Sequence, residues 1–317
     1  MDMKQRYLVT GAAGFIGSHL VETLIDQGQS VVGVDNFITG KRANIEPFAD
    51  RMEFIEGDVR DLELCQRLCN GADFVLHQAA LGSVPRSVDD PITTNDHNLN
   101  GTLAMLVAAR DAKVKRFVYA ASSSAYGDTK VLPKVETLRS TPLSPYAVTK
   151  YVCELYAAVF HGVYGLPTVG LRYFNIFGPR QDPEGAYAAV IPRFVKAVLE
   201  GQPPVIDGDG GQTRDFTFVE NAVQANLKAC HAPEEANGQV FNVGAGDRIS
   251  VLQLAAKVLE LLESDLSPEH VPARAGDVRD SLADIEKARR ILGYDPTVDA
   301  LSGLEKAIGW YRMALAG

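Results

Sequence analysis

A strand-like run followed at once by three evenly spaced glycines most constrains how this chain can fold. The stretch VTGAAGFIGSHL places Gly11, Gly14 and Gly17 between the apolar run RYLVT and a helical pattern that extends from about 15 to 27. Glycine permits a tight turn and lets backbone N–H groups approach a pyrophosphate, which the positive end of the helix dipole also attracts. This strand–turn–helix context predicts a dinucleotide-binding unit at the start of the chain.

Short apolar segments alternate with helical patterns through the first half of the sequence. Strand-like runs occur at 6–10, 30–35, 52–58, 72–80, 116–123 and 168–175. Such alternation is typical of parallel strands connected by helices that cover both faces of a sheet. We therefore predict an α/β fold with a Rossmann-like, doubly wound parallel sheet.

The regular alternation of strand-like and helical segments ends after about residue 175, where Pro, Gly and Asp accumulate in loop-like stretches. Two further strand-like runs, at 215–219 and 239–244, flank a helical pattern over 219–231 and could return to the sheet. The sequence thus predicts two domains. They are a dinucleotide-binding domain at 1–175 plus about 215–245, and a smaller, discontinuous α/β domain for the substrate at about 176–214 plus 246–317.

Composition and charge exclude several classes of protein. The 317 residues carry a net charge of −9 without a basic cluster, which argues against nucleic-acid binding and requires a locally positive pocket for any anionic substrate. No apolar run approaches the ~18 residues that span a bilayer, and the opening residues lead directly into a strand without room for a signal peptide. Cys65 and Cys69 have no histidine close in sequence, so we expect reduced structural thiols, no metal site and a cytoplasmic location.

Asp35 ends the second strand-like run, 24 residues after Gly11. A carboxylate at this position accepts hydrogen bonds from the adenosine ribose hydroxyls and repels a 2′-phosphate, which favours NAD over NADP. Lys41 and Arg42 favour NADP instead, because basic residues here could bind its 2′-phosphate. We give Asp35 the greater weight and expect NAD as the cofactor.

The segment LSPYAVTK, residues 143–150, is a candidate for catalysis. Ser144 is a favourable N-cap, and Tyr146 and Lys150 then lie at i and i+4 on one face of the first helical turns. Upstream, YAASSSAYG places the serines at 122–124 at the carboxyl end of a strand, where an open parallel sheet forms its ligand crevice. An exposed Tyr–Lys pair or a serine-rich turn is ordinary by itself, whereas the ensemble in this order favours an active site.

This ensemble resembles the extended short-chain dehydrogenase/reductase family, which carries Gly-x-x-Gly-x-x-Gly, a Ser or Thr four residues before a Tyr-Gly pair, and Tyr-x-x-x-Lys. Here the second motif is Ser122 before Tyr126-Gly127, and the third is Tyr146 with Lys150. The likeness covers nearly the whole chain. Within the family the chain is most similar to the UDP-N-acetylglucosamine 4-epimerases, on the stretches LGSVPRS, AASSSAYG, GAYAAVIPRF and RDSLADI.

The resemblance implies an isomerase that inverts C4 of a UDP-hexose, preferably UDP-N-acetylglucosamine or UDP-N-acetylgalactosamine, through a transient 4-keto intermediate. Tyr146 would remove the proton of the 4-hydroxyl as a hydride leaves C4 for NAD, and Ser122 would hydrogen-bond the same oxygen. Lys150 would favour the phenolate and hold the nicotinamide ribose. Helical patterns near 99–112 and 146–162 carry apolar residues on more than one face. Because family members often pair these two helices in a four-helix interface, the resemblance implies a homodimer.

The resemblance also implies which further residues bind the two ligands. Besides Tyr146 and Lys150, the cofactor would contact Gly11, Gly14, Phe15, Ile16, Gly17, Asp35, Asn36, Phe37, Thr39, Gly40, Asp58, Val59, Gln78, Ala79, Ala80, Asn98 and Tyr173. Besides Ser122 and Tyr146, the UDP-sugar would contact Ser83, Ser123, Ser124, Asn175, Ala189, Val190, Val205, Ile206, Asp207, Arg214, Arg274, Asp277 and Ser281. Arg214 and Arg274 are the candidates for the diphosphate.

Ser281 carries the expected preference for N-acetylated sugars. Epimerases restricted to glucose and galactose have a bulky Tyr shortly before an Ala-Asp pair, and RDSLAD places Ser281 at that position. The smaller side chain would leave space for an acetamido group. The alternative is a solvent-facing loop serine.

Related reactions within the family leave further functions open for this chain. The 4,6-dehydratases commonly carry Asp-Glu where this chain has Ser123 and Ser124, and the Glu typical of the decarboxylases is absent from the same loop. A UDP-glucose/UDP-galactose or a UDP-uronate 4-epimerase is the alternative function, with Arg86 as a conceivable partner for a carboxylate. A non-catalytic NAD-sensing protein is more remote, because such relatives tend to lose the Tyr or Lys that this chain retains.

Overall fold

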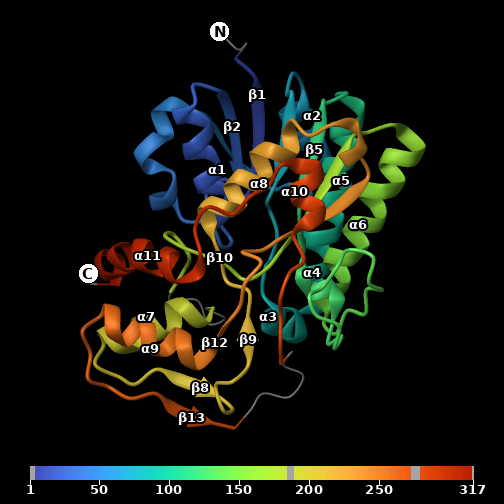
Figure 1. Ribbon diagram of the computed structural model, residues 1–317. Coiled ribbons are helices and arrows are strands. Elements are labelled where there is room, and N and C mark those ends of the chain that lie inside the picture. The colour runs from blue at the N-terminus through green and yellow to red at the C-terminus, as the bar shows by residue number, and fades with distance from the viewer. Residues whose placement is uncertain (1–3, 184–188, 273–278, 316–317) are drawn as a thin grey trace.

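A seven-stranded sheet forms the centre of the computed structural model, which describes residues 4–183, 189–272 and 279–315 (Figure 1). All neighbouring strands in it run parallel. In spatial order they are β11 (Gln239–Val243), β6 (Thr168–Tyr173), β5 (Arg116–Ser122), β4 (Phe74–His77), β1 (Arg6–Thr10), β2 (Ser30–Asp35) and β3 (Glu53–Glu56). The chain order reverses between β1 and β4, which is where such a sheet opens a ligand crevice beyond its carboxyl ends.

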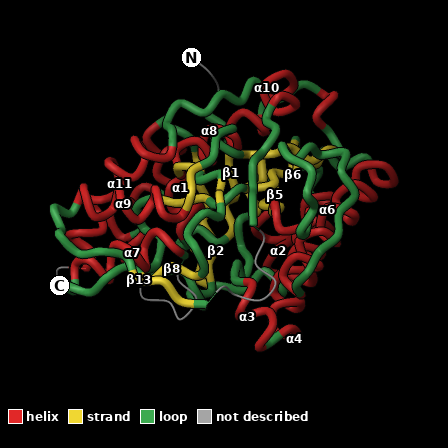
Figure 2. Tube along the Cα trace, turned by 60° about the horizontal axis from the view of Figure 1, so that its bottom comes forward, coloured by secondary structure: helices red, strands yellow, loops and turns green. Residues whose placement is uncertain are grey.

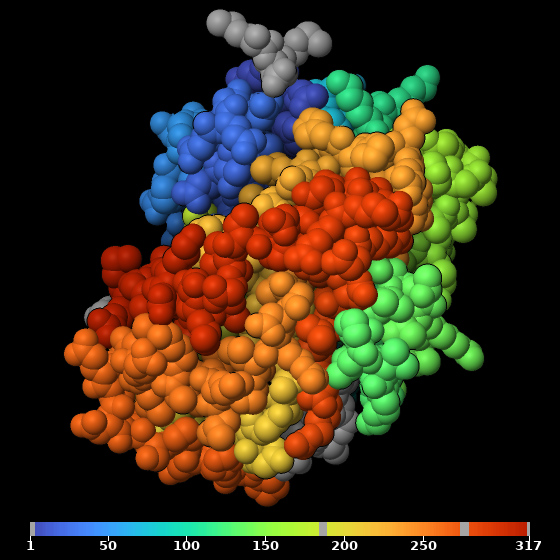
Figure 3. Space-filling view, viewed as in Figure 1, coloured from blue at the N-terminus to red at the C-terminus, as the bar shows by residue number. Residues whose placement is uncertain are grey.

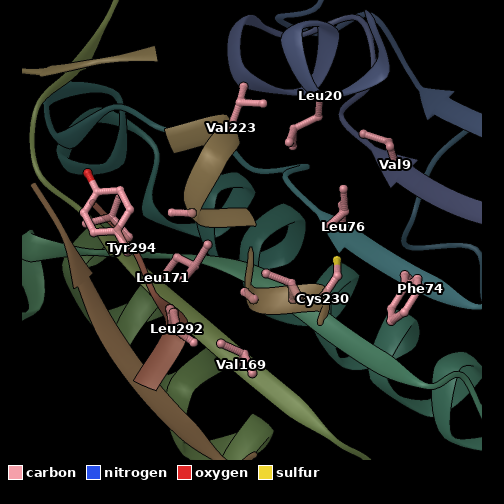
Figure 4. Close-up of a cluster of buried hydrophobic side chains, with 14 of the residues drawn as sticks. Val9, Leu20, Phe74, Leu76, Val169, Leu171, Val223, Cys230, Leu292 and Tyr294 are labelled. Atoms are coloured by element: carbon pink, nitrogen blue, oxygen red, sulfur yellow. The ribbon is translucent and has the colours of Figure 1, made fainter. Parts of the chain in front are cut away.

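Helices cover both faces of this sheet (Figure 2). Successive strand residues point to opposite faces, so that Val9 belongs to one buried cluster and Leu8 to the other. The helices on the face of Val9 are α1 (Phe15–Asp26), α8 (Val219–Cys230) and α10 (Glu286–Leu292), and those on the face of Leu8 are α2 (Leu62–Cys69), α5 (Gly101–Asp111) and α6 (Pro145–Tyr164). Figure 4 shows the first cluster, with Leu20 of α1 and Val223 of α8 beside the sheet.

Later segments of the chain form a separate hydrophobic cluster, which includes Phe194, Ile206 and Tyr311. Its helices are α7 (Val190–Leu199), α9 (Val251–Leu261) and α11 (Ala300–Leu315). Three short strand pairs accompany them: β7 (Ile176–Phe177) with β10 (Thr217–Phe218), β9 (Thr213–Arg214) with β12 (Ile249–Ser250), and β8 (Val205–Asp207) with β13 (Glu269–Val271). The space-filling view shows the segment after residue 280, in red, lying across the boundary between this group and the large sheet (Figure 3).

The remaining elements are short connectors. They are α3 (Val84–Asp89), α4 (Pro91–Asn95), the π-helical turn η3 (Asp96–Asn100), and the 3₁₀ turns η1 (Arg42–Asn44), η2 (Glu46–Arg51), η4 (Ser123–Tyr126) and η5 (Glu234–Ala236). None of the helices in the described ranges combines the length and the apolarity needed to cross a membrane.

The predicted fold class is confirmed, and every strand-like run before residue 175 lies in the large sheet. The run at 239–244 rejoins it as β11, whereas the run at 215–219 does not, since β10 pairs with β7 outside the sheet. The physical reason is that Asn175, with a φ of 38°, turns the chain after β6, and the Asp215 carboxylate is bound by backbone N–H groups of another loop. The domain boundaries stay a prediction; α10, within the range 246–317, packs on the large sheet.

Candidate active site

A large cavity of about 980 Å³ lies at the carboxyl ends of the strands. Residues at the ends of six strands of the large sheet line it: Gly11 follows β1, Asp35 ends β2, Gly57 follows β3, Gln78 follows β4, Ser122 ends β5 and Tyr173 ends β6. The parallel sheet therefore gathers residues that are up to 162 positions apart in the sequence into one crevice.

The glycine turn forms a cradle that has no room for side chains. Gly11 has a φ of +65°, and a Cβ there would lie 2.9 Å from the backbone nitrogen of Ala79. A Cβ on Gly17 would overlap the carbonyl oxygen of Gly11 and lie 2.7 Å from its carbonyl carbon. The N-cap of α1 is Gly14, no side chain caps this helix end, and the residues of its first turn line the cavity, so its free backbone N–H groups are available to a ligand there. This arrangement fits a pyrophosphate.

Asp35 is fixed by backbone groups at the end of β2. Its Oδ2 accepts a hydrogen bond from the Ala13 N–H at 3.0 Å, and its Oδ1 accepts one from the Phe37 N–H at 2.8 Å. Burial raises the pKa of this carboxyl, and the two N–H donors act in the opposite direction. A Cβ on Gly40 would lie 2.7 Å from Oδ1, so a glycine is required there for the carboxylate to keep its place.

The two basic residues after β2 are engaged with acidic residues. Lys41 Nζ lies 2.7 Å from Asp182 Oδ1, and the Arg42 guanidinium pairs with Glu56. Arg42 also stacks over the Phe37 ring, 4.3 Å from its centroid. Because both charges are compensated and neither side chain lines the cavity, they do not create a site for a 2′-phosphate there.

Ser122, Tyr146 and Lys150 all line the cavity. The Ser122 Oγ accepts a hydrogen bond from the Ser124 hydroxyl at 2.8 Å, while Lys150 Nζ donates to the Ala120 carbonyl oxygen at 2.9 Å. The predicted helix start is also present, since the Ser144 Oγ accepts from the backbone of the first turn. Strand β5 and helix α6 thus hold the predicted catalytic residues together.

Burial sets the protonation tendencies of the pair on α6. Burial raises the pKa of the Tyr146 phenol, while a hydrogen bond with the Ser122 hydroxyl lowers it. Burial also lowers the pKa of the Lys150 ammonium. A phenol in this setting is a proton carrier that needs further positive charge before it can act as a base near neutral pH.

The opposite end of the cavity is made by loops. Ser281 is held by a hydrogen bond from its backbone N–H to the Thr213 carbonyl oxygen at 3.1 Å. Arg214 Nη1 donates to the same carbonyl at 2.9 Å, and Asn175 Nδ2 donates to the Asp215 carbonyl oxygen at 3.1 Å. All three of these side chains, at 175, 214 and 281, line the cavity.

The buried Asp215 carboxylate ties these loops to one another. It accepts hydrogen bonds from the backbone N–H groups of Ala245 at 2.7 Å, Gly246 at 3.2 Å and Ala283 at 3.1 Å. Burial raises the pKa of Asp215 to about 6, and these donors oppose the shift. Asp215 therefore positions the segment that carries Ser281 relative to Arg214.

Residues 7–244 match the family model described as the NAD dependent epimerase/dehydratase family. The chain belongs to this family. Its NAD-dependence confirms the cofactor expected from Asp35, and the cavity fits NAD, since the glycine cradle excludes any Cβ and a buried carboxylate ends β2. The residues suited to hold it are those of the turn after β1, the end of β2 and the segment after β4.

Individual family members are similar to the chain over its whole length. A UDP-glucose 4-epimerase of Mycolicibacterium smegmatis is 38% identical over 311 residues, 97% of this chain and 98% of the relative. The UDP-N-acetylglucosamine 4-epimerase from Methanobrevibacter ruminantium, solved with UDP-N-acetylmuramic acid, has a TM-score of 0.93 at 38% identity and covers 99% of this chain and 100% of its own. The UDP-glucuronic acid 4-epimerase from Bacillus cereus, solved with UDP-glucuronic acid and NAD, has a TM-score of 0.89 at 33% identity and covers 98% of this chain and 100% of its own.

Most of the predicted site residues lie together in this epimerase-family cavity. Those that line it are Gly11, Gly14, Phe15, Ile16, Gly17, Asp35, Asn36, Thr39, Val59, Gln78, Ala79, Ala80, Ser122, Ser123, Ser124, Tyr146, Lys150, Tyr173, Asn175, Arg214 and Ser281. Their individual roles stay predictions. Arg274 and Asp277 lie outside the described residues.

A second set of predicted residues does not line the cavity. It comprises Phe37, Gly40, Asp58, Ser83, Asn98, Ala189, Val190, Val205, Ile206 and Asp207. Asn98 is buried and binds the backbone of Leu81, which does line the cavity; its Oδ1 accepts from the Leu81 N–H at 2.7 Å. Ser83 caps α3, and Ile206 lies in the separate hydrophobic cluster.

His77, the last residue of β4, has a structural role. Its two ring nitrogens lie 2.8 Å from the Thr10 hydroxyl and 3.0 Å from the Thr102 hydroxyl. Complete burial lowers its pKa to about 3, so the imidazole is neutral at physiological pH. It supports the strand ends from beneath the cavity and does not line it.

Sequence reasoning missed several residues of the cavity wall. They are Val34, Ile38, Gly57, Leu81, Gly82, Val84, Pro85, Val88, Asp89, His97, Ala120, Ala121, Gly127, Lys134, Leu143, Ser144, Ala147 and Ile176. Most are apolar or small neighbours of predicted residues. Asp89, His97 and Lys134 are ionisable. Of these, Lys134 adds a buried positive charge, and its loop offered no periodicity or motif that could have identified it.

Proposed function

We propose that the protein is an NAD-dependent 4-epimerase of UDP-hexoses that prefers UDP-N-acetylglucosamine and UDP-N-acetylgalactosamine. The observation that carries the preference is Ser281, which is 6% exposed and lines the same cavity as the three predicted catalytic residues. A hydroxymethyl side chain leaves more of the cavity free than a phenol would. This supports a sugar with an acetamido group over one with a hydroxyl at C2.

In the proposed mechanism Tyr146 moves the proton at the sugar's O4. Its phenol takes the proton of the 4-hydroxyl and later returns it, while Ser122 donates a hydrogen bond to the same oxygen in the 4-ketone. NAD, when bound, supplies the reversible removal and return of a hydride at C4. The ketone receives its hydrogen on the other face, so that C4 is inverted without net oxidation.

Lys150 supports this proton transfer through its charge. It lies one helical turn from Tyr146, and an ammonium nearby favours the phenolate over the phenol. The Ala120 carbonyl fixes its position. We assign to Lys150 the additional role of binding the nicotinamide ribose.

Arg214 is proposed to bind the diphosphate of the nucleotide. An arginine can bind phosphate oxygens bidentately, and the cavity needs local positive charge in a chain of net charge −9. Two backbone carbonyls, of Thr213 and Arg279, hold the guanidinium at the cavity wall. Asn175, on the neighbouring loop, is proposed to contact the nucleotide.

The structural observations give less support to a uronate epimerase or an NAD sensor. Arg86, the sequence candidate for a uronate carboxylate, lies on α3 and does not line the cavity. An NAD sensor would have no use for a serine, a tyrosine and a lysine gathered at one wall. A 4-epimerase with an N-acetyl preference accounts for the catalytic residues and for Ser281 together.

Proton NMR of the purified protein with separate UDP-sugars tests this function. We expect UDP-N-acetylglucosamine and UDP-N-acetylgalactosamine to interconvert to the same equilibrium from either side, and faster than UDP-glucose with UDP-galactose. Faster turnover of UDP-glucuronate than of both N-acetyl sugars would refute the preference. No conversion of any UDP-hexose by NAD-loaded protein would refute the enzymatic function.

We also propose that α6 forms a homodimer interface with a second copy of the chain. Its outer face exposes Val148, Leu155, Tyr156, Val159, Val163 and Tyr164, with Val163 68% exposed. An apolar face of this extent on one long helix favours self-association. The neighbouring α5 contributes less, because Leu103 and Val107 are partly buried against the core.

Light scattering at micromolar concentration tests the dimer. We expect twice the 34.3 kDa mass of one chain, and a monomer mass for the double variant Val159→Glu/Val163→Glu. The matched control is Met313→Glu, since Met313 is 75% exposed on α11, away from this face. A monomer mass for the unmodified protein contradicts the proposal.

A further inference from the structure

Lys134 is a buried ammonium at the sugar end of the cavity. The residue is 2% exposed, yet it lines the cavity wall together with Gly127, Arg214 and Ser281. Its Nζ has one hydrogen bond, a long one of 3.5 Å to the Gly127 carbonyl oxygen, and lies 5.8 Å from the centroid of the Tyr126 ring. An ammonium has three donors, so two remain for another acceptor.

The charge of Lys134 lacks a close carboxylate. Among the residues that the structure describes, it has no ion-pair partner, and the exposed Asp128 acts on it only at longer range. Burial lowers the pKa of Lys134, and the charge of Arg214 acts in the same direction. A buried charge without compensation is unfavourable. A strong acceptor on a bound ligand would relieve that cost.

The backbone places Lys134 directly beside the segment that carries Ser281. The Lys134 N–H donates to the Leu282 carbonyl oxygen at 2.8 Å, and the Asp284 N–H donates to the Lys134 carbonyl oxygen at 3.0 Å. These two bonds form a parallel bridge between Lys134 and Ala283. Asn242 Nδ2 donates a third hydrogen bond, to the Lys134 carbonyl oxygen at 2.8 Å. Lys134 and Ser281 are therefore fixed in one rigid part of the wall.

Space alone does not explain a preference for a larger sugar. A cavity that admits an acetamido group also admits the hydroxyl of glucose, so a small residue at 281 permits the N-acetyl sugar without rejecting the simple one. Strong discrimination arises where a buried polar group loses its partner with the wrong substrate. Lys134 is such a group, and it lines the same cavity as Ser281.

We propose that Lys134 is a specificity-determining residue that donates a hydrogen bond to the acetamido carbonyl oxygen of the substrate. This inference rests on the proposed function. Ser281 provides the room for the acetamido group, and Lys134 provides the interaction that a simple hexose cannot satisfy. UDP-glucose would leave the buried ammonium with only its long bond to Gly127.

The test compares Lys134→Met with the unmodified protein on two substrates. Methionine keeps the length of the side chain and removes its charge. We expect kcat/KM for UDP-N-acetylglucosamine to fall roughly tenfold to a hundredfold, and kcat/KM for UDP-glucose to change less than about threefold. Lys134→Gln, which retains a donor, should keep more of the N-acetyl activity than Lys134→Met.

Lys287→Met is the matched control. Lys287 is also partly buried and donates to a backbone carbonyl, of Val240 at 2.8 Å, but it does not line the cavity. Lys287→Met should leave the ratio of kcat/KM for UDP-N-acetylglucosamine to kcat/KM for UDP-glucose unchanged. An equal loss on both substrates in Lys134→Met and Lys134→Gln would assign Lys134 a structural role and overturn the proposal.

Two further measurements separate this proposal from the proposed function. Calorimetry should show that Lys134→Met weakens UDP-N-acetylglucosamine binding and leaves UDP binding unchanged, a result that does not require turnover. Equal affinities of the variant and the unmodified protein for both ligands contradict the role of Lys134 even when epimerisation is observed. Turnover of UDP-glucuronate above that of the N-acetyl sugars, lost in Lys134→Met, would assign the ammonium to a carboxylate instead.

Discussion

The two ends of the cavity are built on different principles. The end that fits NAD consists of positions that directly end or follow strands, such as Gly11, Asp35 and Gln78. The end proposed for the sugar is assembled from segments outside the large sheet, where a bridge between Lys134 and Ala283 ties the loop of Lys134 to the segment that carries Ser281. At the first end the backbone itself makes the site. At the second end the identities of a few side chains do so.

This difference predicts how substitutions should behave. A change at the NAD end alters cofactor retention and therefore affects every substrate equally. A change at the sugar end alters the ratio of kcat/KM between different UDP-sugars and leaves the cofactor bound.

Tyr146→Phe, between the two ends, should have the largest effect. Removing the phenol oxygen removes the proton transfer, so kcat should fall about 10²- to 10⁴-fold on every UDP-sugar. NAD content, measured by absorbance after denaturation, should not change. Tyr156→Phe, on the exposed face of the same helix, is the control that should retain full activity. Full activity in Tyr146→Phe would remove this residue from the mechanism.

Gly17→Ala should act on the NAD end. The added Cβ would overlap the Gly11 carbonyl, which is backbone and cannot rotate away. Such a clash costs up to about 3 kcal/mol, equivalent to roughly a hundredfold weaker NAD binding. Gly162→Ala is the matched control, because Gly162 also lies in a helix but has open space around its Cβ position. A loss confined to one UDP-sugar would contradict the assignment.

Ser281→Tyr should act on the sugar end. A phenol would fill the space proposed for the acetamido group at a cost of ~1–3 kcal/mol, so kcat/KM for the N-acetyl sugars should fall roughly tenfold to a hundredfold. UDP-glucose and UDP-galactose should be spared, and Ser281→Ala, which keeps the space, should show no shift in preference. Parallel kinetics on both substrate pairs would detect an equal loss, which would exclude Ser281 from the sugar site.

Arg214→Ala should have the smallest effect. Loss of one charged contact to a diphosphate should weaken UDP binding about tenfold by calorimetry, on acetylated and simple sugars alike. Arg214→Lys should recover part of this loss, since it keeps the charge without the planar fork. Unchanged UDP affinity in Arg214→Ala would place the diphosphate elsewhere.

The sequence predicted the NAD end well because regular elements determine it. The glycine triplet, the strand ending in Asp35 and the i, i+4 spacing of Tyr146 and Lys150 are local patterns, and parallel strands bring their carboxyl ends to one edge. The parallel sheet itself also followed from the alternation of strands and helices. The exception was the run at 215–219, which forms β10 but pairs with β7 outside the large sheet and is tied to other loops through Asp215.

The sugar end was predicted less completely because contacts between distant loops determine it. Ser281 and Arg214 were found through resemblance, and both line the cavity. Residues 189–190 and 205–207 were assigned in the same way and do not line it. Lys134 left no local signal, since its position depends on a bridge to residue 283, 149 positions further along the chain.

Isotope retention at C4 tests most directly whether the two ends act together as an epimerase. UDP-N-acetylglucosamine that carries deuterium at C4 is incubated with the NAD-loaded protein in ordinary water, and the UDP-N-acetylgalactosamine formed is analysed by NMR and mass spectrometry. Because the hydrogen leaves C4 and returns to the same carbon while the ketone stays in the cavity, we predict that the product keeps its deuterium in full. Formation of a product that has exchanged this deuterium for solvent hydrogen, or no formation of product, would contradict the proposed mechanism.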